Sequence, residues 1–424
     1  MTATILLLVL LLLILLNVPV AFAIGITCLG YLWVGDISLA IMGQRVTQGI
    51  YSYPFLALPM FVFAGVIMEY GGITARLMRL ANALIGHIAG GLAAVMVLGN
   101  ALFGTLCGSA IGGTAAVGSI MIPAMKKKGY AASFAASLQG CCGILSSLIP
   151  PSLTMIIMGV TGNISIADLL IGGFLPGVVM ALLLGGVAIF ISRRQGYGSD
   201  PRASFRELRN AFLAAIPPMM LPVIILGGIF GGIVTVTEAA VLAVVYAFVL
   251  SFFIYREIRL ADLPAICIKV VQIAVPIQLI VAISAMFAWV VTVEQIAQDF
   301  IVLFTQITQD PLGFLALLSL FVLILGTFME SNALIIILVP ILMPVVKQYG
   351  VDPLHFSMIF VTGLCVGAVT PPLGVTLMTA SKIAGIRLSE ACRSLMPFLL
   401  AMVATLIVVI LVPELSTWLP SLMR

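Results

Sequence analysis

Long apolar runs separated by short polar segments extend along almost the whole chain. About 20 apolar residues in a helix cross the hydrocarbon core of a bilayer. The runs predict membrane-spanning helices at residues 6–16, 18–34, 54–70, 169–191, 212–232, 239–255, 270–291 and 395–412. Residues 71–90 and 256–269 are predicted to be amphipathic segments along the interface, and residues 294–310 a polar connector.

Two further apolar regions contain clusters of small or polar residues at their centres. Residues 90–125 contain the sequence GTLCGSAIGGT at positions 104–114, and residues 311–346 contain GTFMESNA at positions 326–333. So many small residues favour two short arms over one continuous span. We therefore predict two re-entrant hairpins, the first with its tip near Gly108 and Ser109.

Two more apolar stretches, residues 130–160 and 353–380, each contain a pair of adjacent prolines, Pro150–Pro151 and Pro371–Pro372. A proline pair removes backbone donors and clashes with the preceding helical turn. Backbone groups freed in this way are tolerated at membrane depth only where protein, an ion or a water-filled cavity satisfies them. Two broken helices at corresponding positions indicate a transporter binding site.

The composition supports a membrane protein and excludes several other classes. Apolar residues make up 62% of the 424 residues and charged residues 8%, against roughly 25% charged in soluble domains. We expect no nucleic-acid partner, because the net charge of +4 reflects loop topology. The N-terminus lacks a basic segment, so we expect no cleaved signal peptide. The seven cysteines have no metal-binding spacing and are predicted to be buried apolar residues.

The chain contains an internal repeat with a constant offset. Pro123 and Pro344, Gly129 and Gly350, and both prolines of each pair are separated by 221 residues. Prolines and glycines are sparse enough for this alignment to indicate a duplication. We predict a first repeat at residues 1–192, a cytoplasmic linker at 193–210 and a second repeat at 211–424.

The distribution of charge predicts that the two repeats are inverted. Five spans per half, with a hairpin that returns to its own side, place the second half upside down. If residues 193–210 are cytoplasmic, 16 of the 19 lysines and arginines fall on the cytoplasmic side. The first hairpin then enters from the cytoplasm and the second from outside, so that their tips meet near the midplane.

This arrangement predicts a site for a cation and an anion. Unwound carbonyls and the hydroxyl or amide oxygens of the tips provide a hard oxygen environment that suits Na⁺. The N-termini of the half-helices favour an anionic substrate such as a carboxylate. The alternative for each small-residue stretch is close helix packing. For Glu330, a role as an ion or proton ligand and a role as a helix cap at the hairpin tip are both open.

Four motifs carry a family resemblance: GSAIGGTAAVGSIMIPAM at 108–125, LIPPS at 148–152, VPILMPV at 339–345 and TPPLG at 370–374. Together they resemble the large membrane subunit (the DctM-like component) of tripartite ATP-independent periplasmic (TRAP) transporters. The resemblance implies Na⁺-coupled import of an organic acid, such as a C4-dicarboxylate or a sugar acid, by an elevator mechanism in the bacterial inner membrane. It also implies a separate small four-helix membrane subunit, a periplasmic substrate-binding protein and a fold similar to the divalent anion–sodium symporters.

Carried over by position, the resemblance implies two groups of site residues. The expected Na⁺ ligands are Gly108, Ser109, Ser146, Ser147, Pro150, Glu330, Ser331, Asn332, Gly367 and Thr370. The expected substrate-binding residues are Ser109, Ala110, Thr114, Pro151, Ser152, Ser331, Asn332, Pro372 and Gly374. Three positions depart from the family pattern: Gly113 replaces a hydroxyl or acid, for which Thr114 is the expected substitute, Ser146 replaces a glycine, and Glu330 replaces an aspartate.

Other functions are compatible with parts of the pattern. A stand-alone Na⁺/anion symporter would have the same architecture and would act without a binding protein. A channel would require a continuous polar pore, and no run of pore-lining polar residues is visible. An enzyme is not expected, because the sequence contains neither HExxH nor GxSxG.

Overall fold

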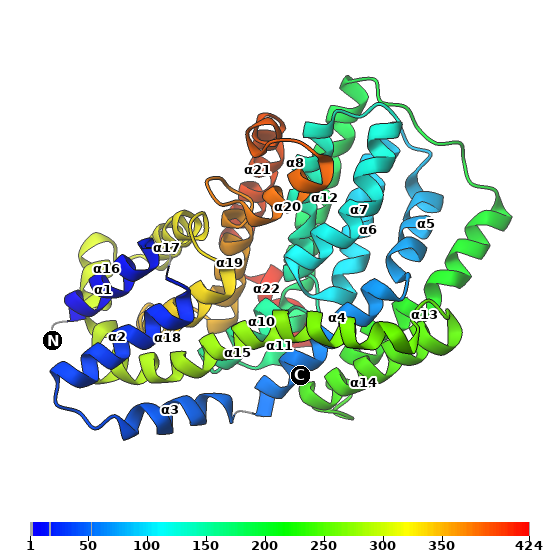
Figure 1. The fold of residues 1–424 in the computed structure, drawn as a ribbon. Coiled ribbons are helices and arrows are strands. Elements are labelled where there is room, and N and C mark those ends of the chain that lie inside the picture. The colour runs from blue at the N-terminus through cyan, green and yellow to red at the C-terminus, as the bar shows by residue number, and fades with distance from the viewer. Residues whose placement is uncertain (1–2, 17, 52, 424) are drawn as a thin grey trace.

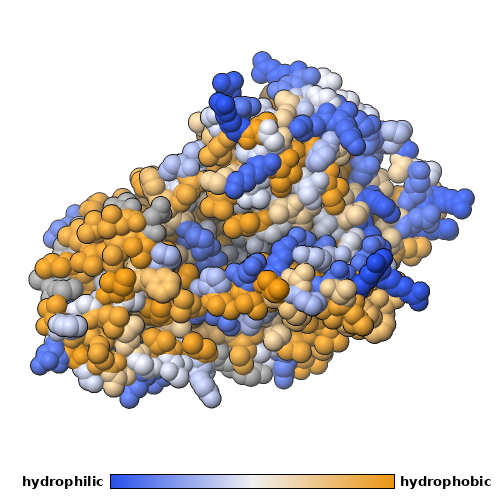
Figure 2. Space-filling model, viewed as in Figure 1, coloured by the Kyte–Doolittle hydropathy of each residue, from blue (hydrophilic) through white to orange (hydrophobic). Residues whose placement is uncertain are grey.

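The computed structural model describes residues 3–16, 18–51 and 53–423, and within these ranges every regular element is a helix (Figure 1). Six helices are long and apolar enough to cross a membrane, or up to nine if each bent pair of helices counts as one span, within the same ranges. The protein is therefore an all-α, multi-pass membrane protein. Figure 2 shows apolar residues over much of its surface. Hydrophilic residues gather around the connection between α12 (Phe174–Arg194) and α13 (Phe205–Phe230).

The first helices of the chain lead to a hairpin, and a matching series recurs later. The early elements are α1 (Ala3–Leu15), α2 (Val20–Val34), α3 (Ala40–Ile50), η1 (Tyr53–Leu56), α4 (Ala57–Tyr70) and α5 (Ile73–Ile85). The later elements are α13 (Phe205–Phe230), α14 (Val236–Phe248), η2 (Val249–Ile254), η3 (Leu260–Asp262), α15 (Leu263–Val293) and α16 (Ile296–Ile307). Helices α2, α3 and α4 pack against α15, and α14 packs against α4. We call α2, α3, α4, α14 and α15 the scaffold helices.

The hairpins and broken helices form what we call the hairpin core. Hairpin 1 consists of α6 (Gly91–Cys107) and α7 (Ala110–Lys127), and hairpin 2 of α17 (Pro311–Gly326) and α18 (Ser331–Gln348). Broken helix 1 comprises α8 (Ala132–Gly143), α9 (Leu145–Leu148) and α10 (Leu153–Gly162), and broken helix 2 comprises α19 (Pro353–Gly367) and α20 (Val375–Ala384). The remaining helices are α11 (Ile166–Gly172), α12 (Phe174–Arg194), α21 (Leu388–Leu411) and α22 (Glu414–Leu422).

The repeat predicted from the prolines also holds for helix boundaries. The start of α18 follows the start of α7 by 221 residues, and the same offset separates the starts of α19 and α8. The hairpins converge on the middle of the molecule from different sides, as the inverted repeat requires (Figure 1). Both proline pairs contain a cis peptide bond, Pro150–Pro151 and Pro371–Pro372.

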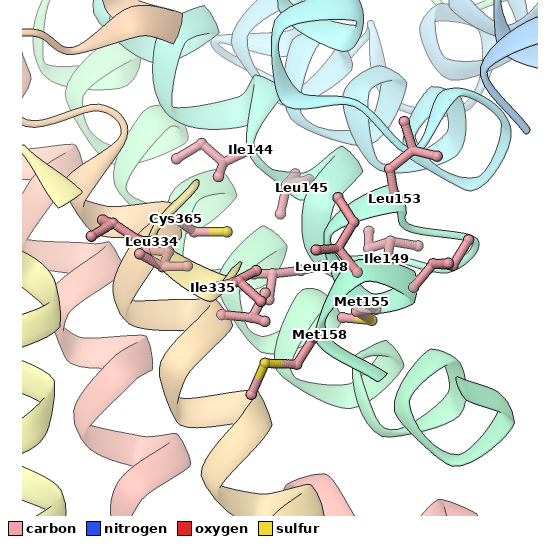
Figure 3. Close-up of a cluster of buried hydrophobic side chains, with 14 of the residues drawn as sticks. Ile144, Leu145, Leu148, Ile149, Leu153, Met155, Met158, Leu334, Ile335 and Cys365 are labelled. Carbon is pink, nitrogen blue, oxygen red and sulfur yellow. The ribbon is translucent and has the colours of Figure 1, made fainter. Parts of the chain in front are cut away.

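The packing between the two halves is crossed, meaning that the broken helix of each half packs against the hairpin of the other half. Helix α10 packs against α18, the second arm of the other half's hairpin, and α20 packs against α7 in the same manner. Figure 3 shows the first of these contacts, where Leu148, Met155 and Met158 lie with Leu334 and Ile335 of α18. All five side chains are buried. Burial of such a side chain contributes roughly 1.5–3 kcal/mol in water, but between helices in lipid the close packing itself provides the attraction.

Two predictions about connectors were wrong. Residues 294–310 contain the helix α16 and are not simply a polar connector. Its residues Ile296 and Phe304 are buried, so apolar positions at helical spacing outweighed the polar residues between them. The predicted segment 256–269 is also divided, because α15 already begins at Leu263. Residues 263–269 became part of the spanning helix α15, whereas residues 296–307 formed a separate helix after a turn at Gln295.

Candidate functional site

A cavity of about 290 Å³ lies where the two hairpin tips meet. It is enclosed by both tips, by residues of both breaks, by the first turns of α10 and α20, and by one face of α15. Its wall consists of Gly108, Ser109, Ala110, Ile111, Ser147, Leu153, Thr154, Ile273, Ile277, Met329, Glu330, Ser331, Asn332, Ala368, Val375 and Thr376. The meeting of the two tips predicted from the charge pattern therefore has a physical cavity at its centre.

The tip of hairpin 1 is closed by a glycine and a capping serine. Gly108 has a φ of +63°, a backbone conformation that favours glycine. A Cβ atom there would also lie 2.7 Å from the Pro151 carbonyl oxygen, so the available space requires glycine as well. The Leu153 N–H donates to the Gly108 carbonyl at 3.2 Å, which joins this tip to the first break. Ser109 caps α7, because its side chain accepts from the Gly112 N–H at 3.3 Å.

Two serine side chains of the first break differ in their hydrogen bonding. The Ser152 hydroxyl donates to the Ser147 carbonyl at 2.6 Å and also caps α10. Ser146 is fully buried, and its Oγ has no hydrogen-bond partner among the described residues. Gly113 of hairpin 1 lies directly against this oxygen, where a side chain would collide with it. A buried hydroxyl without a partner is costly unless something else satisfies it.

The tip of hairpin 2 carries the carboxylate. Glu330 caps α18, because its Oε2 accepts from the Ala333 N–H at 3.1 Å. Its Oε1 accepts from Asn332 Nδ2 at 2.8 Å. Asn332 Oδ1 is buried and has no partner among the described residues. The structure shows the helix cap and places Glu330 in the cavity wall, and the role as an ion or proton ligand stays a prediction.

The second break follows the same plan with different side chains. A Cβ atom at Gly367 would lie 2.7 Å from Gly326 Cα, so the backbones of α19 and hairpin 2 are in direct contact at these two glycines. The Leu373 N–H donates to the Thr327 carbonyl at 3.2 Å, as Leu153 does to Gly108 in the first half. The Thr370 hydroxyl donates to the Val366 carbonyl at 2.7 Å. Its oxygen keeps lone pairs for a further ligand.

The structure places the predicted residues in two groups. Gly108, Ser109, Ala110, Ser147, Glu330, Ser331 and Asn332 line the cavity. Ser146, Pro150, Pro151, Ser152, Thr114, Gly367, Thr370, Pro372 and Gly374 lie outside its wall. Thr114 is fully buried, and its hydroxyl donates to the Ala110 carbonyl at 2.7 Å. Ser146 and Gly367 are equivalent residues in the two halves, 221 positions apart, and each lies against a glycine of its own hairpin's first arm, Gly104 and Gly326.

Some wall residues were not predicted. Thr154 and Thr376 are both the second residue of the helix that follows a proline pair. Their position, in the first helical turn after each break, is a signal that could have identified them. Ile273 and Ile277 of α15 lie one turn apart and face the cavity from the scaffold. Two isoleucines in an apolar span carry no sequence signal of this kind.

Helix N-termini and one carboxylate determine the electrostatics of the wall. The first turns of α7, α10, α18 and α20 all reach the cavity, and helix N-termini present free N–H groups with a partial positive charge. Glu330 is the charged side chain of this wall, which contains neither lysine nor arginine. No group of three or more His, Cys, Asp or Glu residues suited to a metal occurs in the part of the chain that the structure describes. Neutral oxygens and one carboxylate are the ligands that remain for a cation.

Comparison with known proteins agrees with the motifs. The family model for the DctM component of the tripartite ATP-independent periplasmic transporter matches residues 7–415. The chain is 37% identical over 369 residues to the C4-dicarboxylate TRAP transporter large permease protein DctM of Pseudomonas aeruginosa, covering 87% of this chain and 86% of that protein.

Two further relatives are named for other acids. The chain is 34% identical to the sialic acid TRAP transporter large permease protein SiaM of Vibrio cholerae, covering 96% of this chain and 95% of the relative. It is 33% identical to the 2,3-diketo-L-gulonate TRAP transporter large permease protein YiaN of Escherichia coli, with 94% of each covered.

A solved structure shares the fold at low sequence identity. The Alcanivorax borkumensis YdaH transporter superposes with a TM-score of 0.55, 14% identity and 88% coverage of both chains. The overall fold is thus shared with a transporter of distant sequence. With the motifs, the cavity and the family match taken together, the chain belongs to the DctM component family, the large permease proteins of TRAP transporters.

Proposed function

We propose that this permease imports an organic acid anion together with Na⁺ across the bacterial inner membrane. The observation that carries the proposal is the cavity at the two hairpin tips, in which four helix N-termini and one carboxylate converge. The relatives named above carry C4-dicarboxylates, sialic acid and diketogulonate, and all of these substrates are acids.

In the part of the chain that the structure describes, unpaired oxygens at the breaks and tips support the proposed sodium coupling. Ser146 Oγ and Asn332 Oδ1 are buried acceptors without partners among the described residues, and both lie at the breaks and tips. A Na⁺ ion bound by such oxygens would satisfy them and would offset the negative charge of the substrate. One ion would bind near Ser146, Ser147 and Gly108, and another near Asn332, Gly367 and Thr370.

The movement that we propose is of the elevator type. The hairpin core carries both sets of site residues, whereas the scaffold helices contribute the isoleucine face of α15 to the cavity. The part of α15 that lines this cavity offers the core no polar anchor, which favours movement of the core along it. A small four-helix membrane subunit and a periplasmic substrate-binding protein complete the system, since the chain belongs to the large subunit family of a tripartite transporter.

Reconstitution in liposomes tests the function. The purified chain is combined with the small subunit and binding protein of its own system, and uptake of radiolabelled succinate and N-acetylneuraminate is followed under an inward Na⁺ gradient. We expect uptake of an acid only with all three components and only with Na⁺. Equal uptake in K⁺ would disprove the sodium coupling. Uptake by the chain alone would identify a stand-alone symporter.

A further inference from the structure

A second cavity, of about 220 Å³, lies beside the first, between the scaffold helices and the tip of hairpin 1. The two cavities share Ser109, Ile111, Leu153 and Ile273 in their walls, so they adjoin each other. If hairpin 1 enters from the cytoplasm, as the charge distribution predicts, this second cavity lies on the path by which substrate leaves.

The second cavity contains an ion pair between two scaffold helices. Lys269 of α15 and Glu69 of α4 both line it, and Lys269 Nζ lies 2.8 Å from Glu69 Oε1. The two side chains are 34% and 28% exposed, so both charges remain accessible from the cavity. Lys269 also lies on the same face of α15 as Ile273 and Ile277, the two residues that line the first cavity.

The end of the first arm of hairpin 1 packs against α4 one helical turn from Glu69. A Cβ atom at Gly65, one helical turn before Glu69, would lie 3.3 Å from the Cys107 carbonyl oxygen at the end of α6. The small residue lets hairpin 1 rest against α4. An anion that leaves the first cavity past Ser109 therefore meets the Lys269 ammonium while hairpin and scaffold are in contact.

We propose that Lys269 guides the substrate anion on the hairpin 1 side and that Glu69 holds its ammonium until the anion arrives. The carboxylate of the substrate then replaces Glu69 as the partner of Lys269, and Glu69 takes it back when the substrate leaves. A charged partner is needed here because the apolar walls around the pair weaken hydration of a carboxylate. The inference rests on the proposed function and adds a residue outside the tips and breaks.

The experiment compares four variants in the three-component liposome assay, with the acid that the wild-type system takes up. We expect K269Q and the neutral pair E69Q/K269Q to lower the maximal uptake rate about 10-fold or more, because a hydrogen bond to a charged group is lost. K269R keeps the positive charge and should retain most of the rate. The variant K128Q/D200N, which removes the ion pair of 2.8 Å between Lys128 and Asp200 away from the cavity, should leave the rate unchanged.

The double variant E69Q/K269Q distinguishes a role in guiding the substrate from a role in joining α4 to α15. If the ion pair only joins α4 to α15, replacing both charges by amides keeps a hydrogen-bonded pair, and E69Q/K269Q should transport at the wild-type rate. That result, with normal folding by size-exclusion chromatography, would overturn the proposal. Absence of Na⁺-dependent uptake in the wild type would instead count against the proposed function.

A second measurement needs no substrate. Ile111 is 46% exposed and lines both cavities, so I111C, in a C107A/C267A/C392A background, reports the local potential. We measure its modification by an anionic and by a cationic methanethiosulfonate. We expect K269Q to lower the anionic-to-cationic rate ratio about fivefold, the effect of one unit charge a few ångström away in a partly hydrated site. E69Q should raise the ratio. A ratio that is unchanged in both variants would show that Lys269 exerts no attraction on anions in the cavity.

Discussion

Ser109 and Glu330 occupy the same position in the two halves, 221 residues apart, and each caps the second arm of its hairpin while lining the shared cavity. One cap is a neutral hydroxyl and the other is a carboxylate. The cap role is therefore common to both halves, and the charge is specific to the second. A substitution that removes the negative charge of Glu330 but keeps the capping hydrogen bond separates the two roles.

The variant E330Q keeps an acceptor for the Ala333 N–H and removes the negative charge. We expect the apparent Na⁺ affinity to fall about 10-fold, since an interaction with a charged group is worth about 1.5–3 kcal/mol. The measurement is the Na⁺ concentration for half-maximal uptake. E207Q is the matched control, because the Glu207 carboxylate accepts from the Ser204 N–H at 2.7 Å in the capping box of α13, outside the cavity. Equal Na⁺ dependence in E330Q and wild type would leave Glu330 as a cap alone.

The variant S146A removes a buried hydroxyl that has no partner among the described residues. We expect no loss of thermal stability in Na⁺-free buffer, but a weaker apparent affinity for Na⁺. The control is S137A, because Ser137 Oγ donates to the Ala391 carbonyl at 2.5 Å and its loss should cost about 1 kcal/mol. If S146A destabilises the protein as much as S137A does and Na⁺ dependence stays unchanged, Ser146 is a packing residue.

The variant T370V keeps the shape of the side chain and removes an oxygen beside the second break. We expect the apparent Na⁺ affinity to fall, with normal insertion into the membrane. T405V is the matched control in α21, outside the cavity wall, where a fully buried threonine hydroxyl donates to the Ala401 carbonyl at 3.0 Å in the same i−4 pattern. Uptake as a function of Na⁺ concentration distinguishes the two variants. Identical curves would remove Thr370 from the proposed ligands.

The variant G367A tests the close approach of α19 to hairpin 2. A Cβ atom would lie 2.7 Å from Gly326 Cα, so the backbones must separate, at a cost of about 1–3 kcal/mol. G363A lies one turn earlier, where a Cβ atom would meet Val322 at an ordinary 3.5 Å. We expect a lower melting temperature in detergent for G367A and an unchanged or higher one for G363A, since alanine favours the helix. Equal melting temperatures would show that the contact can relax.

The sequence predicted the parts of this fold that depend on backbone chemistry. Prolines and glycines restrict the backbone locally, so Pro150–Pro151, Pro371–Pro372 and Gly108 indicated the breaks and a tip without any knowledge of packing. The predicted tips do meet at a cavity. The domain boundaries and the ion ligands stay predictions.

The sequence did not predict contacts that depend on how distant helices pack. Ile273 and Ile277 face the cavity only because α15 lies against both tips, and isoleucine is equally common on a face in contact with lipid. The cavity wall also excludes Thr114, because its hydroxyl bonds within its own helix instead of pointing outward. Side-chain direction is decided by neighbours that a single sequence does not identify.

The crossed packing of α10 on α18 and of α20 on α7 means that neither half holds a complete binding site. Each half's broken helix rests on the hairpin arm of the other half, with Leu334 and Ile335 buried in that contact. A half produced alone would expose these residues and leave its half-helix unsupported. This packing couples each hairpin to the other half's break, so we expect the proposed cation and anion sites to move together as one unit.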